Sequence, residues 1–277
     1  ENPRMQFQLI QSKLLDKNGL WATYEKALNR FGEDQYQSLQ PLIIEQDIPT
    51  LQSHIKSGLL SYEKLTLFYL YRIRKLESDP NTTLHAILAL NPMVIEQAKA
   101  KDRQKNTQHH PIFGMPILLK DNINTQDMPT TAGAAFLQSH VPDNDAYIVS
   151  QLQAKGALIL GKVNLSEWAY YFCDGCPLGY SAVGGQTLNP YGRKVFESGG
   201  SSSGSGVAVA ANYAVAAVGS ETSGSILSPS GHNAVVGCKP TIGLVSRTGI
   251  VPISSTLDTA GPMTKNVIDN AILLNAM

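Results

Sequence analysis

The sequence predicts an α/β protein with a mixed, largely parallel β-sheet that is covered by helices on both faces. Short apolar runs of strand length stand at residues 84–90, 117–119 and 157–160. Segments that favour helices, residues 92–104 and 145–155, alternate with these runs, and such alternation is typical of parallel or mixed sheets. At 277 residues, the chain is long enough for one large α/β core or two small domains.

The first part of the chain differs in pattern from the rest. Residues 1–45 favour amphipathic helices, and we expect them to form a helical extension before a main domain at residues 46–277. The apolar residues of this extension divide between two faces, one with Phe7, Ile10 and Leu14 and the other with Trp21, Tyr24 and Leu28.

Two helix starts can be predicted from capping residues. Ser61 is expected to cap a helix with its side-chain oxygen. The apolar residues that this helix would turn toward the core are Leu65, Phe68, Ile73 and Leu76. Asn91 and Pro92 are expected to open the next helix, because proline is favoured at the first helical position.

The charge balance argues against nucleic acid and anionic membranes as partners. Lys and Arg number 22, Asp and Glu also number 22, and the formal net charge is zero. A basic surface patch is therefore not expected. The chain has no run that approaches the roughly 20 apolar residues of a membrane span. A small neutral molecule fits this composition best as a substrate.

The cysteines do not predict a cofactor. Cys173 and Cys176 have C-x-x-C spacing, which occurs in redox sites and in half of a zinc site. Cys238 is the third cysteine, so no second pair exists, and the six histidines do not cluster with these residues. We predict neither a metal site nor a cofactor.

A glycine- and serine-rich segment, residues 199–206, runs directly into an apolar stretch. Residues 207–211 and 213–219 predict a buried helix followed by a buried strand, which argues against a flexible linker. Neither the Walker pattern nor the dinucleotide-binding glycine pattern is present, which argues against nucleotide binding. Hydroxyl groups beside a tight turn favour nucleophilic chemistry instead.

Lys120 is the candidate base for such a serine. It follows the apolar run at residues 117–119, and burial can lower the pKa of a lysine until the neutral amine is populated. From these residues alone, a lysine that reaches water or pairs with Asp121 remains the alternative. His232 lies close to Ser228 and Ser230, but no G-x-S-x-G pattern accompanies it, and we interpret it as a surface residue.

Three segments together resemble the amidase signature family, and the pattern is similar to bacterial amidases of the peptide-amidase type. They are residues 114–121, 199–205 and 219–226, and Ser201 and Ser225 stand at the spacing of the family's bridging and nucleophilic serines. Further similarity, at residues 161–168, 184–190 and 236–262, extends the resemblance from about residue 45 to the last residue.

The resemblance implies a fold, a reaction and a set of residues. It implies an amidase that cleaves linear C–N amide bonds of neutral carboxamides or peptide C-terminal amides through an acyl-enzyme. Ser225 would be the nucleophile, Ser201 the bridging serine after a cis peptide bond, and Lys120 the base. Backbone N–H groups would form the oxyanion hole, and they belong to Thr222, Ser223, Gly224 and Ser225.

Two positions depart from the family pattern. Ser223 replaces a glycine of many members, and Leu227 stands where amidotransferase subunits that act on charged tRNA commonly carry arginine. The leucine disfavours an acidic substrate. Two alternatives to a hydrolase remain open, an inactive binding module of the same fold and a glutamyl-tRNA amidotransferase A-type subunit.

The last residues predict an incomplete sheet. Residues 264–277 read as the start of a helix without a terminating glycine or proline, and members of the family usually continue well beyond this point. We expect a fragment, a processed half or a shortened variant, with an apolar sheet edge or face exposed unless a companion chain supplies the missing C-terminal part.

Overall fold

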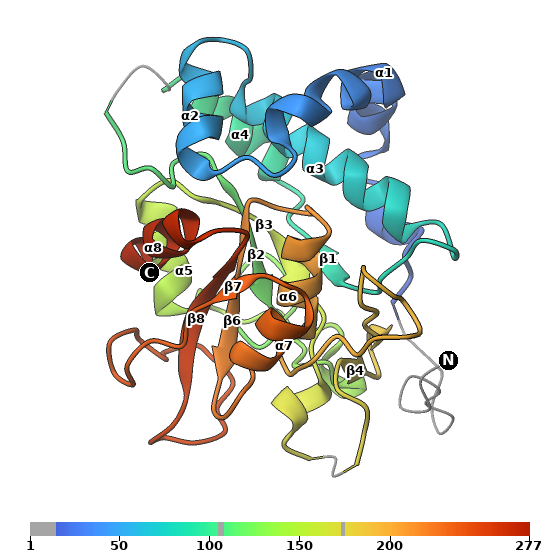
Figure 1. Ribbon diagram of the computed structural model, residues 1–277, viewed down its shortest axis with the longest axis vertical. Coiled ribbons are helices and arrows are strands. Elements are labelled where there is room, and N and C mark those ends of the chain that lie inside the picture. Colours follow the sequence, from blue (N-terminus) through green and yellow to red (C-terminus); the bar gives the residue numbers. More distant parts are fainter. Residues whose placement is uncertain (1–14, 105–107, 173–174) are drawn as a thin grey trace.

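A six-stranded sheet forms the centre of the computed structural model, which describes residues 15–104, 108–172 and 175–277 (Figure 1). Its spatial order is β1, β3, β2, β6, β8, β7 within the described residues. The strands are β1 Ile87–Leu90, β2 Pro116–Lys120, β3 Leu158–Val163, β6 Ala216–Glu221, β7 Val236–Gly237 and β8 Thr259–Thr264. A separate hairpin consists of β4 Tyr180–Ser181 and β5 Gly185–Gln186.

The strand directions confirm a mixed, largely parallel sheet. β2 is parallel to both of its neighbours, β3 and β6. β1 is antiparallel to β3, β8 is antiparallel to β6, and β7 is antiparallel to β8. Consequently β3, β2, β6 and β7 run in one direction, and β1 and β8 run in the other. The central strands are buried along their whole length, as expected for parallel strands with helices on both faces.

Helices lie on both sides of the strands in Figure 1, with α5 and α8 to the left and α6 and α7 to the right. A layer of further helices, α1 to α4, lies at the top of the view. The bounds are α1 Glu25–Ile43, α2 Ile48–Lys56, α3 Tyr62–Glu77, α4 Val94–Asp102, α5 Tyr147–Ala154, α6 Ser203–Ala210, α7 Leu227–His232 and α8 Val267–Ala276. Short 3₁₀ turns occur at Gly19–Trp21, Ala135–Leu137 and Glu167–Tyr170. In the described part of the chain, no helix is both long and apolar enough to cross a bilayer.

The N-terminal helices belong to the main hydrophobic core. Trp21, Tyr24 and Leu28 are buried in the same cluster of side chains as the central strands, whereas Phe7, Ile10 and Leu14 lie outside the described residues. α1 is interrupted at Gly32, whose φ of 67° is readily adopted only by glycine. The boundary between an extension at residues 1–45 and a domain at residues 46–277 stays a prediction.

One of the two predicted helix starts is confirmed. Ser61 caps α3, because its Oγ accepts a hydrogen bond from the Lys64 backbone N–H at 3.1 Å. The second prediction was wrong, since α4 begins at Val94 and not at Pro92. The Asn91 side chain accepts the Met93 N–H at 2.9 Å, and this local turn delays the helix.

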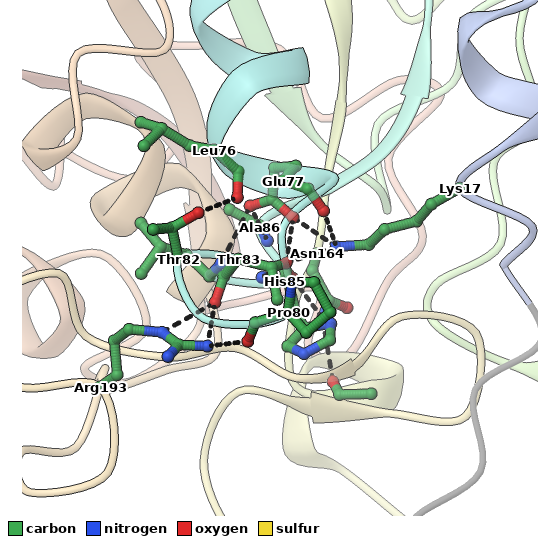
Figure 2. Close-up of polar contacts among 12 residues, drawn as sticks. Lys17, Leu76, Glu77, Pro80, Thr82, Thr83, His85, Ala86, Asn164 and Arg193 are labelled. Carbon is green, nitrogen blue, oxygen red and sulfur yellow. Dashed lines mark hydrogen bonds and ion pairs between the residues drawn. The ribbon is translucent and has the colours of Figure 1, made fainter.

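A buried carboxylate anchors the N-terminal segment to the loop before β1 (Figure 2). Glu77, at the end of α3, forms an ion pair with Lys17 and accepts hydrogen bonds from Thr83 Oγ1 at 2.8 Å and from the Ala86 N–H at 3.1 Å. The Ala86 carbonyl in turn accepts the Asn164 N–H at 2.8 Å. This network therefore links the outer helices to the loop that follows β3.

Candidate active site

Lys120 occupies the last position of the central strand β2, and its side chain is completely buried. Its Nζ donates hydrogen bonds to Ser201 Oγ at 2.7 Å and to the Ser220 carbonyl at 3.1 Å. The apolar run before it places the amine at the end of a buried strand, as the sequence predicted. The structure therefore brings Lys120 and Ser201 together.

Burial lowers the pKa of Lys120 to about 7, although the carboxylates of Glu221 and Asp258 raise it. The cause is the loss of water around the ammonium form, which disfavours the charged state. About half of the amine is then neutral at pH 7. A neutral amine has a free lone pair and can accept a proton.

Asp121 does not pair with Lys120. It forms an ion pair with Lys162, with 3.0 Å between Lys162 Nζ and Asp121 Oδ1, and both side chains are buried. Its other oxygen accepts the Thr131 N–H at 3.0 Å. Successive residues of an extended chain point to opposite sides, so Asp121, which directly follows β2, turns its side chain away from that of Lys120. The alternative left open by the sequence is thereby resolved, and no carboxylate among the described residues forms an ion pair with Lys120.

Ser201 lies in the tight turn that precedes α6. The Gly200–Ser201 peptide bond is cis, as the resemblance implied. The Ser201 carbonyl accepts the Ser166 N–H at 3.0 Å, and the next residue, Ser202, donates its N–H to the Ser225 carbonyl at 3.1 Å. These bonds fix the turn on both sides and hold it against the segment that contains Ser225.

Gly204, in the first turn of α6, allows this helix to approach the loop after β3. A Cβ atom at this position would lie 2.4 Å from the Asn164 carbonyl oxygen. The Gly204 N–H donates to that same carbonyl at 2.9 Å. A larger residue would push α6, and with it the Ser201 turn, away from the loop.

Ser225 and Ser201 line one cavity of about 440 Å³. Ser225 is 9% exposed, and no described residue forms a hydrogen bond with its Oγ. The cavity wall also includes Asn122, Thr222 and Arg247. A hydroxyl that faces a cavity beside a second, lysine-bonded hydroxyl is placed to attack a bound carbonyl compound. The Ser201–Ser225 hydrogen bond itself is not formed here, and such bonds often form only when substrate is bound.

Glu221 shapes the turn that carries Ser225, and the sequence analysis assigned it no role. Its carboxylate accepts the Gly224 and Ile226 N–H groups at 2.7 Å each and the Leu227 N–H at 3.0 Å. An acidic residue at the end of a strand, three residues before a glycine in a tight turn, could have signalled this.

These contacts change the expected oxyanion hole. The Gly224 N–H, one of four predicted donors, is directed to Glu221. Within the described part of the chain, the N–H groups of Thr222, Ser223 and Ser225 have no protein acceptor. Thr222 and Ser225 belong to the cavity wall, so their N–H groups remain available to a ligand there, whereas Ser223 is exposed.

The other residues singled out in the sequence do not join this site. His232 is exposed, and its Nδ1 lies 2.8 Å from the Ser228 carbonyl. Cys176 is disulfide-bonded and Cys238 is free, whereas Cys173 lies outside the described residues. Across the residues that the structure describes, no group of three His, Cys, Asp or Glu side chains could hold a metal ion.

Comparisons with known proteins place the chain beside amidases. A protein named "Probable amidase" from Arabidopsis thaliana is 44% identical over 240 residues, which cover 85% of this chain and 46% of that protein. The A-type subunit of the glutamyl-tRNA(Gln) amidotransferase from Exiguobacterium sibiricum is 40% identical over 235 residues, with 85% and 47% covered. The chain thus spans about half the length of these relatives.

A solved structure gives the same result. The native peptide amidase of Stenotrophomonas maltophilia superposes with a TM-score of 0.81 and 48% identity, over 84% of this chain and 48% of that one. The family model described as Amidase matches residues 64–277, which include the Lys120 strand, the Ser201 turn and the Ser225 segment. The chain belongs to the Amidase family.

Proposed function

We propose that this chain carries the nucleophile and base of an amide hydrolase that cleaves neutral carboxamides or peptide C-terminal amides through an acyl-enzyme on Ser225. The observation that carries the proposal is the 2.7 Å contact between Lys120 Nζ and Ser201 Oγ. Because burial lowers the pKa of this lysine to about 7, the contact can carry a proton toward nitrogen.

The reaction begins with two proton transfers. Neutral Lys120 accepts the hydroxyl proton of Ser201, and Ser201 accepts the proton of Ser225 as Ser225 Oγ bonds to the amide carbon. The carbonyl electron pair moves to oxygen and gives a tetrahedral intermediate. When this intermediate collapses, the C–N bond breaks and the relay returns a proton to the departing nitrogen. Water then cleaves the ester of Ser225 by the same relay.

The negative oxygen of the intermediate needs hydrogen-bond donors. The free N–H groups of Thr222, Ser223 and Ser225 are candidates, and the loss of one such donor typically reduces the rate about 10²–10³-fold. Glu221 supports this role because its carboxylate accepts the Gly224 N–H, and this hydrogen bond fixes the backbone around these donors.

The carboxylates of Glu221 and Asp258 lie in the cavity wall and disfavour an acidic substrate. Asp258 accepts hydrogen bonds from the Thr222 hydroxyl and from the Ile253 N–H, and Arg247 donates to the Ser254 carbonyl at 3.2 Å. These bonds engage both oxygens of Asp258 and one guanidinium nitrogen of Arg247. Leu227, at the base of the turn, is about half exposed and offers an acidic substrate no counter-charge.

A role as an amidotransferase A-type subunit is the second candidate, because a relative with that name shares 40% identity. Such a protein would release ammonia from glutamine only together with a partner protein. The inactive binding module, the third alternative, predicts no reaction at Ser225. Ammonia release from simple carboxamides by the chain alone would separate hydrolysis from both.

The test is covalent labelling with a fluorophosphonate, followed by intact-mass analysis and an ammonia assay on a panel of carboxamides. We expect one adduct per chain in the wild type and none in Ser225→Ala. Ser228→Ala is the matched control, because this serine lies three residues further along, and it should label normally. An adduct on Ser225→Ala, or no adduct on the wild type, would contradict the proposal.

A further inference from the structure

A second cavity, of about 550 Å³, opens beside the one that holds the serines. The two cavities share the wall residues Asn122, Ala169, Val251, Pro252 and Ile253. Because five residues belong to both walls, the two cavities are direct neighbours, and a substituent of an amide held at Ser225 would reach the second cavity past these residues. This cavity has no role in the proton relay described above.

Aromatic side chains form the outer wall of the second cavity. Phe136 is 77% exposed and Phe172 is 72% exposed, which is unusual for phenylalanine. Their rings flank Trp168, at centroid distances of 5.8 Å and 5.7 Å. None of the residues that line this cavity carries a formal charge. We call Phe136, Trp168 and Phe172, with this cavity, the aromatic cleft.

The backbone beneath Trp168 has a costly conformation. Trp168, Ala169 and Tyr170 have φ values of 52°, 53° and 74°, in a region that residues other than glycine rarely adopt. Such strain of about 1–3 kcal/mol for each residue is concentrated at ligand-binding and catalytic sites. Hydrogen bonds hold the segment in place, from the Trp168 N–H to the Ala132 carbonyl at 2.8 Å and from the Tyr170 hydroxyl to the Cys176 carbonyl at 2.9 Å.

We propose that the aromatic cleft is a substrate subsite that receives an uncharged aryl or bulky alkyl substituent of the amide. The inference rests on the proposed function, because it takes Ser225 as the point of attack. The cleft is concave and shares a wall with the serine cavity, its wall offers rings and no charges, and the strained backbone sets the rings at its edge. Ring-on-ring contact would add to the burial of apolar area.

The expected preference follows from the buried area. Burial of a phenyl-sized group contributes on the order of 1.5–3 kcal/mol, so phenylacetamide should bind at least about tenfold more tightly than acetamide. Truncation of either exposed phenylalanine should reduce this ratio, since part of the wall is removed. Because both side chains are largely exposed, neither truncation removes core packing.

Binding can be measured without turnover. Trp21 and Trp168 are the two tryptophans of the chain, so a Trp21→Phe, Ser225→Ala protein reports on Trp168 fluorescence alone. Phenylacetamide and acetamide are titrated into this protein and into derivatives with Phe136→Ala or Phe172→Ala. Phe196→Ala is the matched control, because Phe196 is also exposed but lines neither cavity.

We expect the dissociation constant of phenylacetamide to be at least about tenfold below that of acetamide. The ratio of the two constants should fall by about threefold or more with Phe172→Ala or Phe136→Ala. It should not change with Phe196→Ala. Equal dissociation constants, or a ratio that neither truncation alters, would overturn the subsite. Ammonia release by the Trp21→Phe protein is measured separately. Tight phenylacetamide binding without ammonia release would leave the subsite standing and overturn the hydrolase instead.

Discussion

Two lysines on neighbouring strands of the sheet have the same burial and different surroundings. Lys120 ends β2, Lys162 lies in β3, and both side chains are completely buried. The register pairs Leu119 with Lys162 and Lys120 with Val163, so the two lysines point to opposite faces of the sheet. Asp121, next to Lys120 in the chain, points to the face of Lys162 and pairs with it.

The two lysines show that burial and ion pairing have separate effects on a lysine side chain. Burial lowers the pKa of both lysines, and carboxylate charges raise both. For Lys120 these charges belong to Glu221 and Asp258, which form no ion pair with it among the described residues, whereas Asp121 is bonded to Lys162. Lys162 also donates to Thr130 Oγ1 at 2.8 Å. A buried lysine with a bonded carboxylate is a structural ion pair, whereas one that faces a serine hydroxyl without an ion-pair partner is a candidate base.

The largest expected effect is the loss of activity in Lys120→Arg. Guanidinium keeps the positive charge but does not deprotonate in proteins, so it cannot accept the Ser201 proton. We expect kcat/KM for a neutral carboxamide to fall by about 10³-fold or more. Steady-state ammonia release measures this effect. If the variant retained a tenth of the activity, Lys120 would not be the base of the reaction.

The second prediction concerns stability and distinguishes the two lysines directly. Lys162→Met leaves the buried Asp121 carboxylate unpaired and should lower the free energy of unfolding by about 3–5 kcal/mol. Adding Asp121→Asn should restore most of the loss. Lys120→Met removes a lysine whose burial is not offset by an ion pair, so it should change the free energy of unfolding by less than about 1 kcal/mol, or raise it.

Urea denaturation of the wild type and of these three variants checks this prediction. Similar losses in Lys120→Met and Lys162→Met would show that both lysines have the same structural role. In that case, the contrast between the two faces of the sheet would carry no functional meaning.

The smallest expected effect is a shift in pH dependence with Glu221→Gln. The Glu221 carboxylate raises the pKa of Lys120, so its neutralisation should lower that pKa and move the midpoint of the pH–activity profile to lower pH. The two oxygens of the Glu221 carboxylate accept the Gly224 and Ile226 N–H groups, whereas a glutamine side chain has only one accepting oxygen. One of these hydrogen bonds is therefore lost from the turn that carries Ser225, and kcat should also fall by about tenfold. Asp143→Asn, at an exposed carboxylate, is the control and should leave the midpoint in place.

Local patterns predicted part of this structure. The apolar run before Lys120 was enough to predict a buried strand with an amine at its end, and the glycine–serine segment before an apolar stretch predicted a turn followed by a buried helix and strand. The Asp121–Lys162 pair was missed because Asp121 follows β2 while Lys162 lies in β3, and only the register of these two strands brings them together.

Other differences arose from side chains that bond to the backbone. Asn91 shifts the start of α4 by two residues, and Glu221 takes the Gly224 N–H that was expected to face the oxyanion. Composition and spacing do not indicate which of several nearby N–H groups a carboxylate will choose. The aromatic cleft was missed for a similar reason, since Phe136 and Phe172 meet Trp168 only through the loop conformation.

The central claim is that neutral Lys120 activates Ser225 through Ser201, and the most direct test is the pH dependence of the rate at which a fluorophosphonate labels Ser225. Only the neutral amine accepts a proton, and its pKa is about 7, so the rate should rise with pH to a plateau with a midpoint near pH 7. In Lys120→Met, labelling should be slow and should lack this midpoint. A wild-type midpoint near the usual lysine value of about 10, or a profile that Lys120→Met leaves unchanged, would contradict the account.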